Sequence, residues 1–114
     1  MTSPLYTLDV GHPARHPDIV EDLLLEAWER VRNSPALRVI KVIHGYGSGG
    51  KGGSTREVVR NWLFRHRERF RGIVYGEEYD PQNSSVQSIR KEIGHYDDPD
   101  LTFPNPGITI IWVK

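Results

Sequence analysis

The apolar residues of this chain fall into four short runs and two longer stretches with a regular period. The short runs are rich in β-branched and aromatic side chains, which predicts strands. In the longer stretches the apolar residues recur every three or four positions, which predicts amphipathic helices. The predicted elements are strand 5–10, helix 18–32, strand 38–44, helix 55–69, strand 72–76 and strand 107–113. Their order along the chain is βαβαββ.

The first predicted helix has the clearest pattern, with one apolar stripe and an acidic opposite face. Asp18 and Glu21 fit a capping arrangement at its start. Asn33, Ser34 and Pro35 are typical of a helix end. Three tryptophans occupy apolar positions of the pattern and are expected in the core: Trp28, Trp62 and Trp112.

Residues 38–44 are almost continuously apolar, which suits an interior strand. With the preceding strand and helix they form a βαβ unit, which is right-handed in nearly all proteins. Residues 77–106 are polar and contain four prolines, so we expect an excursion from the fold with a short helix at about 84–93. The pattern predicts a single α/β (α+β) domain over residues 1–114.

The composition suits one small globular domain. The chain has 114 residues, of which 37% are hydrophobic and 26% charged, and its mean hydropathy is −0.54. It has no cysteine, which excludes disulfides, zinc ribbons and thiol catalysis. No apolar run approaches the ~18 residues of a membrane span, and the first residues lack a signal-peptide pattern. We therefore expect a cytoplasmic protein with no membrane partner.

The net charge is zero, which argues against a strongly basic coat for nucleic acid. The charges are unevenly distributed along the chain, however. Residues 51–72 hold seven basic side chains against two acidic ones, and the rest holds eight against thirteen. This run predicts either a surface that contacts a phosphate backbone or an ordinary solvated helix face.

Residues 45–53 contain six glycines in nine positions. Such a loop can expose backbone N–H groups, and the four residues after it form a capping box at the start of a helix. With the charges of Lys51 and Arg56, this predicts an anion site for phosphate. Tyr46 is placed to stack on a base or sugar. The expected phosphate- and nucleic-acid-binding residues are Gly45, Tyr46, Gly47, Ser48, Gly49, Gly50, Lys51, Ser54, Arg56 and Arg60.

The loop nearly matches two nucleotide-binding motifs. Gly45, Gly50 and Lys51 fit the start of a P-loop, but Gly52 stands where that motif requires a hydroxyl. The glycines also satisfy the dinucleotide fingerprint, yet that fold needs more strands than this chain can supply. Neither nucleotide-binding fold is favoured.

Three candidate catalytic residues lie at or just after the ends of the first two predicted strands: Asp9, His12 and His44. The carboxyl ends of parallel strands meet at one edge of the sheet, where ligands bind. Core packing poorly explains His44, between an apolar strand and a glycine loop. His12 and His16 lie four residues apart with Asp9 nearby and could ligate a metal, but two histidines without a paired motif are a weak signal, and no metal ligand is assigned.

The sequence around the glycine loop resembles the Smr (small MutS-related) domain family. The family's second motif is His-Gly-x-Gly, which His44, Gly45 and Gly47 match. The extended His-Gly-Tyr-Gly loop looks most like that of a short, stand-alone branch of the family.

The family's first motif is Leu-Asp-x-His-Gly, and it is matched only in part. Leu8 and Asp9 match its start, the family's histidine position is Gly11 here, and His12 occupies the glycine position. The resemblance extends over most of the chain, from the first strand to the second helix and the closing strand.

This resemblance implies a fold similar to the C-terminal domain of translation initiation factor three. That fold has two layers, with two helices on a four-stranded mixed sheet whose last strand is antiparallel and interior. The resemblance also implies nucleic-acid binding, and several family members are nicking endonucleases or endoribonucleases.

Three functions follow from these observations. The first is a module that binds DNA or RNA through the glycine loop and the basic helix, without a required cofactor. The second is an endonuclease in which Asp9 orients a base or holds Mg or Mn, and His12 or His44 is the general acid or base. The third is a module for a small phosphate ligand or a protein partner. A structure in which residues 77–106 cover the basic helix would favour this third function.

Overall fold

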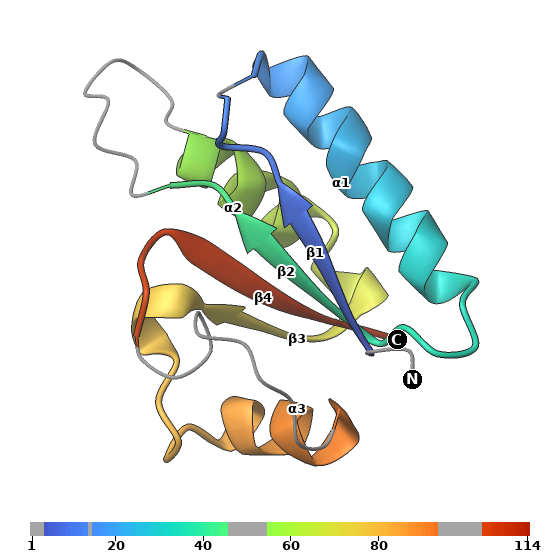
Figure 1. Cartoon of the computed structure of the whole chain (residues 1–114), viewed down its shortest axis with the longest axis vertical. Helices are drawn as coiled ribbons and strands as arrows, with labels where there is room; N and C mark the ends of the chain where they lie inside the picture. Colours follow the sequence, from blue (N-terminus) through green and yellow to red (C-terminus); the bar gives the residue numbers. More distant parts are fainter. Residues whose placement is uncertain (1–3, 14, 46–54, 94–103) are drawn as a thin grey trace.

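The computed structural model describes residues 4–13, 15–45, 55–93 and 104–114. Four strands, three α-helices and two short 3-10 helices lie in these ranges (Figure 1). In chain order they are β1 (Leu5–Asp9), α1 (Pro17–Arg32), β2 (Val39–Ile43), α2 (Thr55–Arg65), η1 (Arg67–Arg69), β3 (Phe70–Tyr75), η2 (Gly76–Glu78), α3 (Ser84–Ile93) and β4 (Ile108–Val113).

The strands form one mixed sheet in the order β1-β2-β4-β3. β1 and β2 are parallel, and β4 runs antiparallel to both of its neighbours. The prediction of an interior, antiparallel last strand is thus confirmed. β4 can be interior because its side chains are apolar on both faces, apart from the fully buried Thr109.

α1 and α2 cover one face of this sheet (Figure 1). Val20, Leu24, Ala27 and Val31 form the buried stripe of α1, as its period predicts. These residues pack on alternate side chains of the strands, such as Ile40 of β2. The expected two-layer arrangement of helices on a four-stranded mixed sheet is confirmed.

The opposite face is partly covered by α3, a third helix in addition to the two expected from the resemblance. Val86 and Ile89 of α3 are buried against Val39, Val74 and other side chains of the sheet. Residues 84–93 are therefore helical, as their apolar spacing indicates. The excursion that begins at residue 77 contributes a second apolar cluster to the fold.

Two details of the helices differ from the sequence interpretation. The side chain of His16, rather than those of Asp18 and Glu21, caps α1: its Nδ1 accepts the N–H of Asp18 at 3.1 Å. Pro17 follows as the first helical residue, where a missing N–H costs no hydrogen bond. The second helix ends at Arg65 instead of 69, and η1 leads directly into β3.

Candidate functional site at the carboxyl edge of the parallel strands

The carboxyl ends of β1 and β2 lie at one edge of the sheet, near the start of α2 (Figure 1). Gly11 holds the loop after β1 close to the end of β2. A Cβ at this position would lie 2.9 Å from the carbonyl carbon of His44, so a larger residue would force the two segments apart. The sequence thus brings the Asp9 and His44 segments together, as the parallel arrangement predicts.

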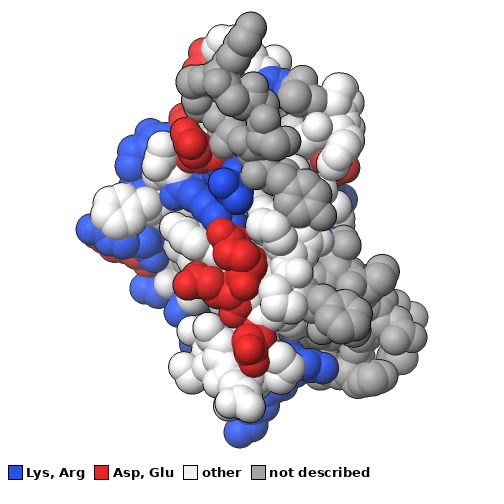
Figure 2. All heavy atoms as spheres, turned by 90° about the vertical axis from the view of Figure 1, so that its left-hand side faces the viewer, with Lys and Arg blue, Asp and Glu red and all other residues white. Residues whose placement is uncertain are grey.

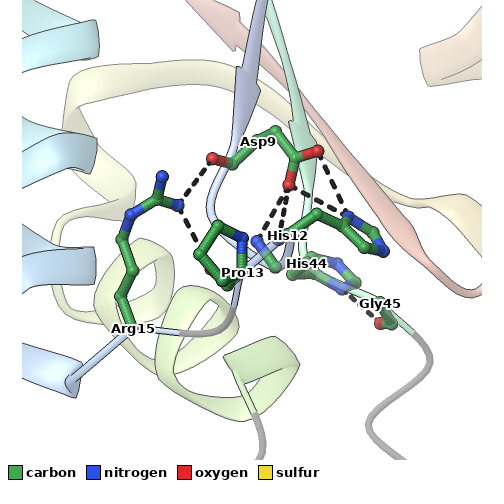
Figure 3. A network of polar contacts seen from close by, with 7 residues as sticks. Asp9, His12, Pro13, Arg15, His44 and Gly45 are labelled. Atoms are coloured by element: carbon green, nitrogen blue, oxygen red, sulfur yellow. Dashed lines mark hydrogen bonds and ion pairs between the residues drawn. The ribbon is translucent and has the colours of Figure 1, made fainter.

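Asp9 and His12 form an exposed pair at this edge (Figure 3). Asp9 Oδ1 accepts the backbone N–H groups of Gly11 and His12 at 2.9 and 3.0 Å. His12 Nδ1 lies 3.2 Å from both carboxylate oxygens. Because a carboxylate only accepts, it favours the tautomer with hydrogen on Nδ1 and leaves Nε2 as the basic atom. A histidine oriented in this way can transfer a proton.

Arg15 reinforces the turn that carries this pair. Its Nη1 donates to the carbonyl oxygens of Asp9 at 3.0 Å and Pro13 at 3.4 Å (Figure 3). The turn includes a cis peptide bond between His12 and Pro13. The position of His12 is therefore determined by backbone contacts as well as by the Asp9 carboxylate.

His44 has a different environment because it is buried, with 3% of its surface exposed. Nδ1 lies 2.7 Å from the Gly45 carbonyl oxygen and Nε2 lies 2.8 Å from the Thr109 hydroxyl. The carbonyl can only accept, so Nδ1 carries the hydrogen and Nε2 accepts from Thr109. Burial, opposed by the Gly45 bond and assisted by nearby arginine charges, lowers the pKa of His44 to about 4. His44 is thus neutral near pH 7, with both ring nitrogens hydrogen-bonded.

Arg60 continues this network from α2. Its Nε donates to the Thr109 hydroxyl at 3.2 Å, and its Nη1 and Nη2 donate to the two carboxylate oxygens of Glu77 at 2.8 and 2.6 Å. The guanidinium also lies 4.0 Å from the centre of the Tyr75 ring. The hydrogen bond from Arg60 is the main reason that the pKa of Glu77 falls to about 2. Glu77 thereby holds η2 against α2.

The described site residues therefore form two groups. Asp9 is with His12, and His44 is with Gly45 and, through Thr109, with Arg60. Arg56 lies close enough for its charge to lower the pKa values of both His44 and Glu77. The remaining expected binding residues lie outside the described residues: Tyr46, Gly47, Ser48, Gly49, Gly50, Lys51 and Ser54.

Sequence reasoning missed Thr109, Glu77 and Tyr75 as members of this site. Thr109 had a recognisable signal, since it is the one hydroxyl in an otherwise apolar strand. Glu77 and Tyr75 had none, because their pairing with Arg60 depends on where β3 ends beside α2. His16 does not join His12, since it caps α1. Within the described ranges, no three His, Asp or Glu side chains form a metal-binding group.

The basic run predicted over residues 51–72 does not form one continuous surface. Arg56 and Arg60 lie near the carboxyl edge of β1 and β2, whereas Arg69 and Arg71 lie at the other end of the sheet, where β3 begins. Arg65 pairs with Glu21 of α1. The face in Figure 2 accordingly shows basic and acidic side chains next to each other.

No family model, curated protein or solved structure matches this chain. Within the described part of the chain, no helix has the length and apolar character needed to cross a membrane.

Proposed function

We propose that this protein binds the phosphates of a nucleic acid at the carboxyl edge of β1 and β2. The observation that supports this proposal is the convergence of Arg56, the start of α2 and the exposed His12 at one edge. A helix start supplies backbone N–H groups and partial positive charge, and arginine adds a full charge. The resemblance to the Smr family, carried by His44, Gly45 and Gly47, favours nucleic acid as the source of the phosphate.

In this proposal His44 supports the binding site without contacting the ligand. Its hydrogen bonds to Gly45 and Thr109 fix the point where the glycine loop leaves β2. Because His44 stays neutral near pH 7, it adds no charge at the end of β2. The charge of Arg60 is offset by its ion pair with Glu77. Arg56 is therefore the better candidate for direct phosphate contact.

The binding proposal is tested by fluorescence anisotropy with labelled single-stranded and hairpin DNA and RNA. We expect Arg56→Gln to weaken binding about threefold or more and to flatten its salt dependence, because one phosphate contact is removed. Arg90→Gln, at an exposed position of α3, makes the same change in net charge and should have little effect. Equal weakening by both variants, or no binding by the wild type, would contradict the proposal.

A second candidate function, phosphodiester cleavage, is favoured by one observation: the carboxylate of Asp9 orients His12. Neutral His12 Nε2 can take a proton from an attacking hydroxyl or water, and the Asp9 carboxylate stabilises the imidazolium that forms. His44 is poorly suited to this role because both of its ring nitrogens are already hydrogen-bonded.

The residues at this edge fit a divalent metal poorly. Asp9 accepts two backbone N–H groups and faces His12, and no second carboxylate accompanies it in a metal-binding group of the described residues. Asp9 is therefore better suited to orient His12 than to hold Mg or Mn.

The cleavage proposal is tested with supercoiled plasmid, branched DNA and structured RNA. His12→Gln should abolish cleavage, and Asp9→Asn should reduce it by orders of magnitude while the substrates still bind. His16→Asn is the matched control, since asparagine removes an exposed imidazole but keeps a side-chain acceptor for the cap of α1. Cleavage that survives in His12→Gln would remove this histidine from the mechanism.

A further inference from the structure

A cavity of about 280 Å³ lies at the opposite end of the sheet from the candidate site. It is formed where α1 ends, β2 begins and β4 ends, with α3 beside it (Figure 1). Apolar side chains and four basic ones line it, with a single acidic side chain. The lining residues are Val31, Arg32, Ser34, Leu37, Arg38, Arg71, Glu92, Val113 and Lys114.

The four basic residues come from four different segments of the chain. Arg32 ends α1, Arg38 precedes β2, Arg71 lies in β3 and Lys114 follows β4. The fold gathers them at one point although the sequence separates them, and only Arg71 belongs to the basic run 51–72. The charge at this cavity could not be found from the sequence.

Arg38 is already occupied by the protein itself. Its guanidinium donates to the carbonyl oxygens of Ser34, Pro35 and Leu37, and its Nε lies 3.7 Å from Glu92. Arg38 thus closes the loop between α1 and β2, and Glu92 is balanced by this one arginine.

The other three cations differ from Arg38. Among the residues that the structure describes, Arg32, Arg71 and Lys114 form no ion pair with a carboxylate. The guanidinium groups of Arg32 and Arg71 lie 4.6 and 5.7 Å from the ring centres of Trp28 and Trp112. These aromatic contacts hold the arginines without occupying their N–H donors.

Three cations around one cavity, none of them in an ion pair with a carboxylate of the described residues, repel each other, and a multiply charged oxyanion would relieve that repulsion. Arginine N–H groups match the oxygens of phosphate, and lysine adds a point charge. A phosphate monoester carries close to two negative charges near pH 7, whereas a phosphodiester carries one. The apolar walls formed by Val31, Leu37 and Val113 suit the carbon part of such a ligand. The volume is near the lower limit for ligand sites, which favours a small group over an extended backbone.

We propose that this cavity binds a phosphate monoester through Arg32, Arg71 and Lys114. The group belongs either to a free nucleotide or sugar phosphate or to the phosphorylated end of a nucleic acid. This site is separate from the Asp9–His12 edge, so it does not depend on the function proposed above.

The proposal is tested by calorimetric titration of the full chain with a nucleoside 5′-monophosphate and with the corresponding nucleoside. We expect the monophosphate to bind and the nucleoside not to bind. The double variant Arg71→Gln, Lys114→Gln should lose at least tenfold in affinity, and Arg90→Gln should stay within twofold of the wild type. Both altered residues are at the surface, and circular dichroism would verify that the variants fold. Absence of monophosphate binding, or equal losses in both variants, would overturn the proposal.

Two further arms identify the ligand. Affinity for the monophosphate should rise severalfold from pH 5.5 to 7.5, because the second phosphate pKa is about 6, and no histidine lines the described cavity. A flat profile would contradict a monoester site. The second arm uses an oligonucleotide with a 5′-phosphate. If it binds more tightly than both the mononucleotide and its own unphosphorylated form, the ligand is the end of a nucleic acid. Otherwise the ligand is the free monoester.

Discussion

His44 illustrates how a histidine at a candidate site can be held by the fold in a way that does not suit proton transfer. A histidine before a glycine loop is an obvious candidate for proton transfer. Its hydrogen bonds to Gly45 and Thr109 instead fix it as a neutral, buried link between β2 and β4. His12 departs from the family motif, yet of the two candidate catalytic histidines it is the one whose ring is exposed and oriented by a carboxylate.

The buried state of His44 predicts a specific pH dependence of stability. Its pKa falls from 6.5 to about 4 on folding, so the unfolded chain binds more protons between these values. The stabilisation is complete above pH 6.5 and is lost as the pH falls toward 4. Between pH 7 and pH 5 the loss should be about 2 kcal/mol.

Urea unfolding of the wild type and His44→Gln at pH 7 and pH 5 checks this expectation. The difference in unfolding free energy between the two proteins should shrink at pH 5, because the variant has no titrating ring at this position. A difference that is the same at both pH values would show that His44 is not held neutral.

Removal of the Thr109 hydroxyl should also lower the stability of the protein. Thr109→Val keeps the shape of the side chain but removes the hydroxyl that joins His44 and Arg60. His44 Nε2 and Arg60 Nε then lose this hydrogen-bond partner. We expect a loss of about 1–3 kcal/mol in unfolding free energy. Thr7→Val, at an exposed position of β1, should change stability by less than about 0.5 kcal/mol. Similar results for both variants would argue against the Arg60–Thr109–His44 network.

At the scale of elements, the short η2 helix links the excursion to the candidate site. It follows β3 directly, and Gly76 permits its close approach to the segment before β4. A Cβ at Gly76 would lie 1.8 Å from the Asn105 carbonyl oxygen and 2.6 Å from Ile108. The Asn105 N–H also donates to the Gly76 carbonyl at 2.7 Å.

This packing predicts that Gly76→Ala is strongly destabilising, by about 3 kcal/mol or more, because backbone atoms must move. Gly72→Ala is the matched control in the same strand region, since the nearest atom to its Cβ would be at an ordinary 3.8 Å. Thermal unfolding of both variants tests the contrast. A mild effect of Gly76→Ala would mean that η2 is not packed as described.

The ion pair between η2 and α2 predicts an effect on binding. Glu77 neutralises Arg60, so Glu77→Gln should raise the positive potential at the proposed nucleic-acid site and increase oligonucleotide affinity about threefold or more at low salt. Glu78→Gln removes the same charge from the neighbouring exposed position. An equal increase in both variants would assign the effect to net charge alone.

The sequence predicts most elements of the fold because their apolar periods are strong. Both long helices and all four strands follow from periodicity, and the parallel pairing of β1 with β2 follows from the βαβ order. The His16 cap was missed because it depends on side-chain geometry before Pro17. The pairing of Arg60 with Glu77 could not be predicted from residue types, since it requires the position of η2.

Over the whole molecule, a net charge of zero conceals two separate regions with different electrostatic character. At the carboxyl edge of β1 and β2, Glu77 offsets Arg60 beside Arg56 and the Asp9–His12 pair. At the opposite end, the cavity near Lys114 holds more cations than carboxylates. The basic run over residues 51–72 contains arginines of both regions, such as Arg56 and Arg71. Only the three-dimensional structure shows that they lie at opposite ends of the sheet.

Nucleic-acid binding at the carboxyl edge of β1 and β2 is tested most directly by residue-resolved mapping of the contact by NMR. The ¹⁵N-labelled chain would be titrated with an oligonucleotide that lacks terminal phosphates, so that the Lys114 cavity is not engaged. We expect amide shift changes concentrated around His12, Gly45 and Arg56, and their loss at high salt. Saturating shifts confined to other surfaces, or no shifts at all, would contradict nucleic-acid binding at this edge.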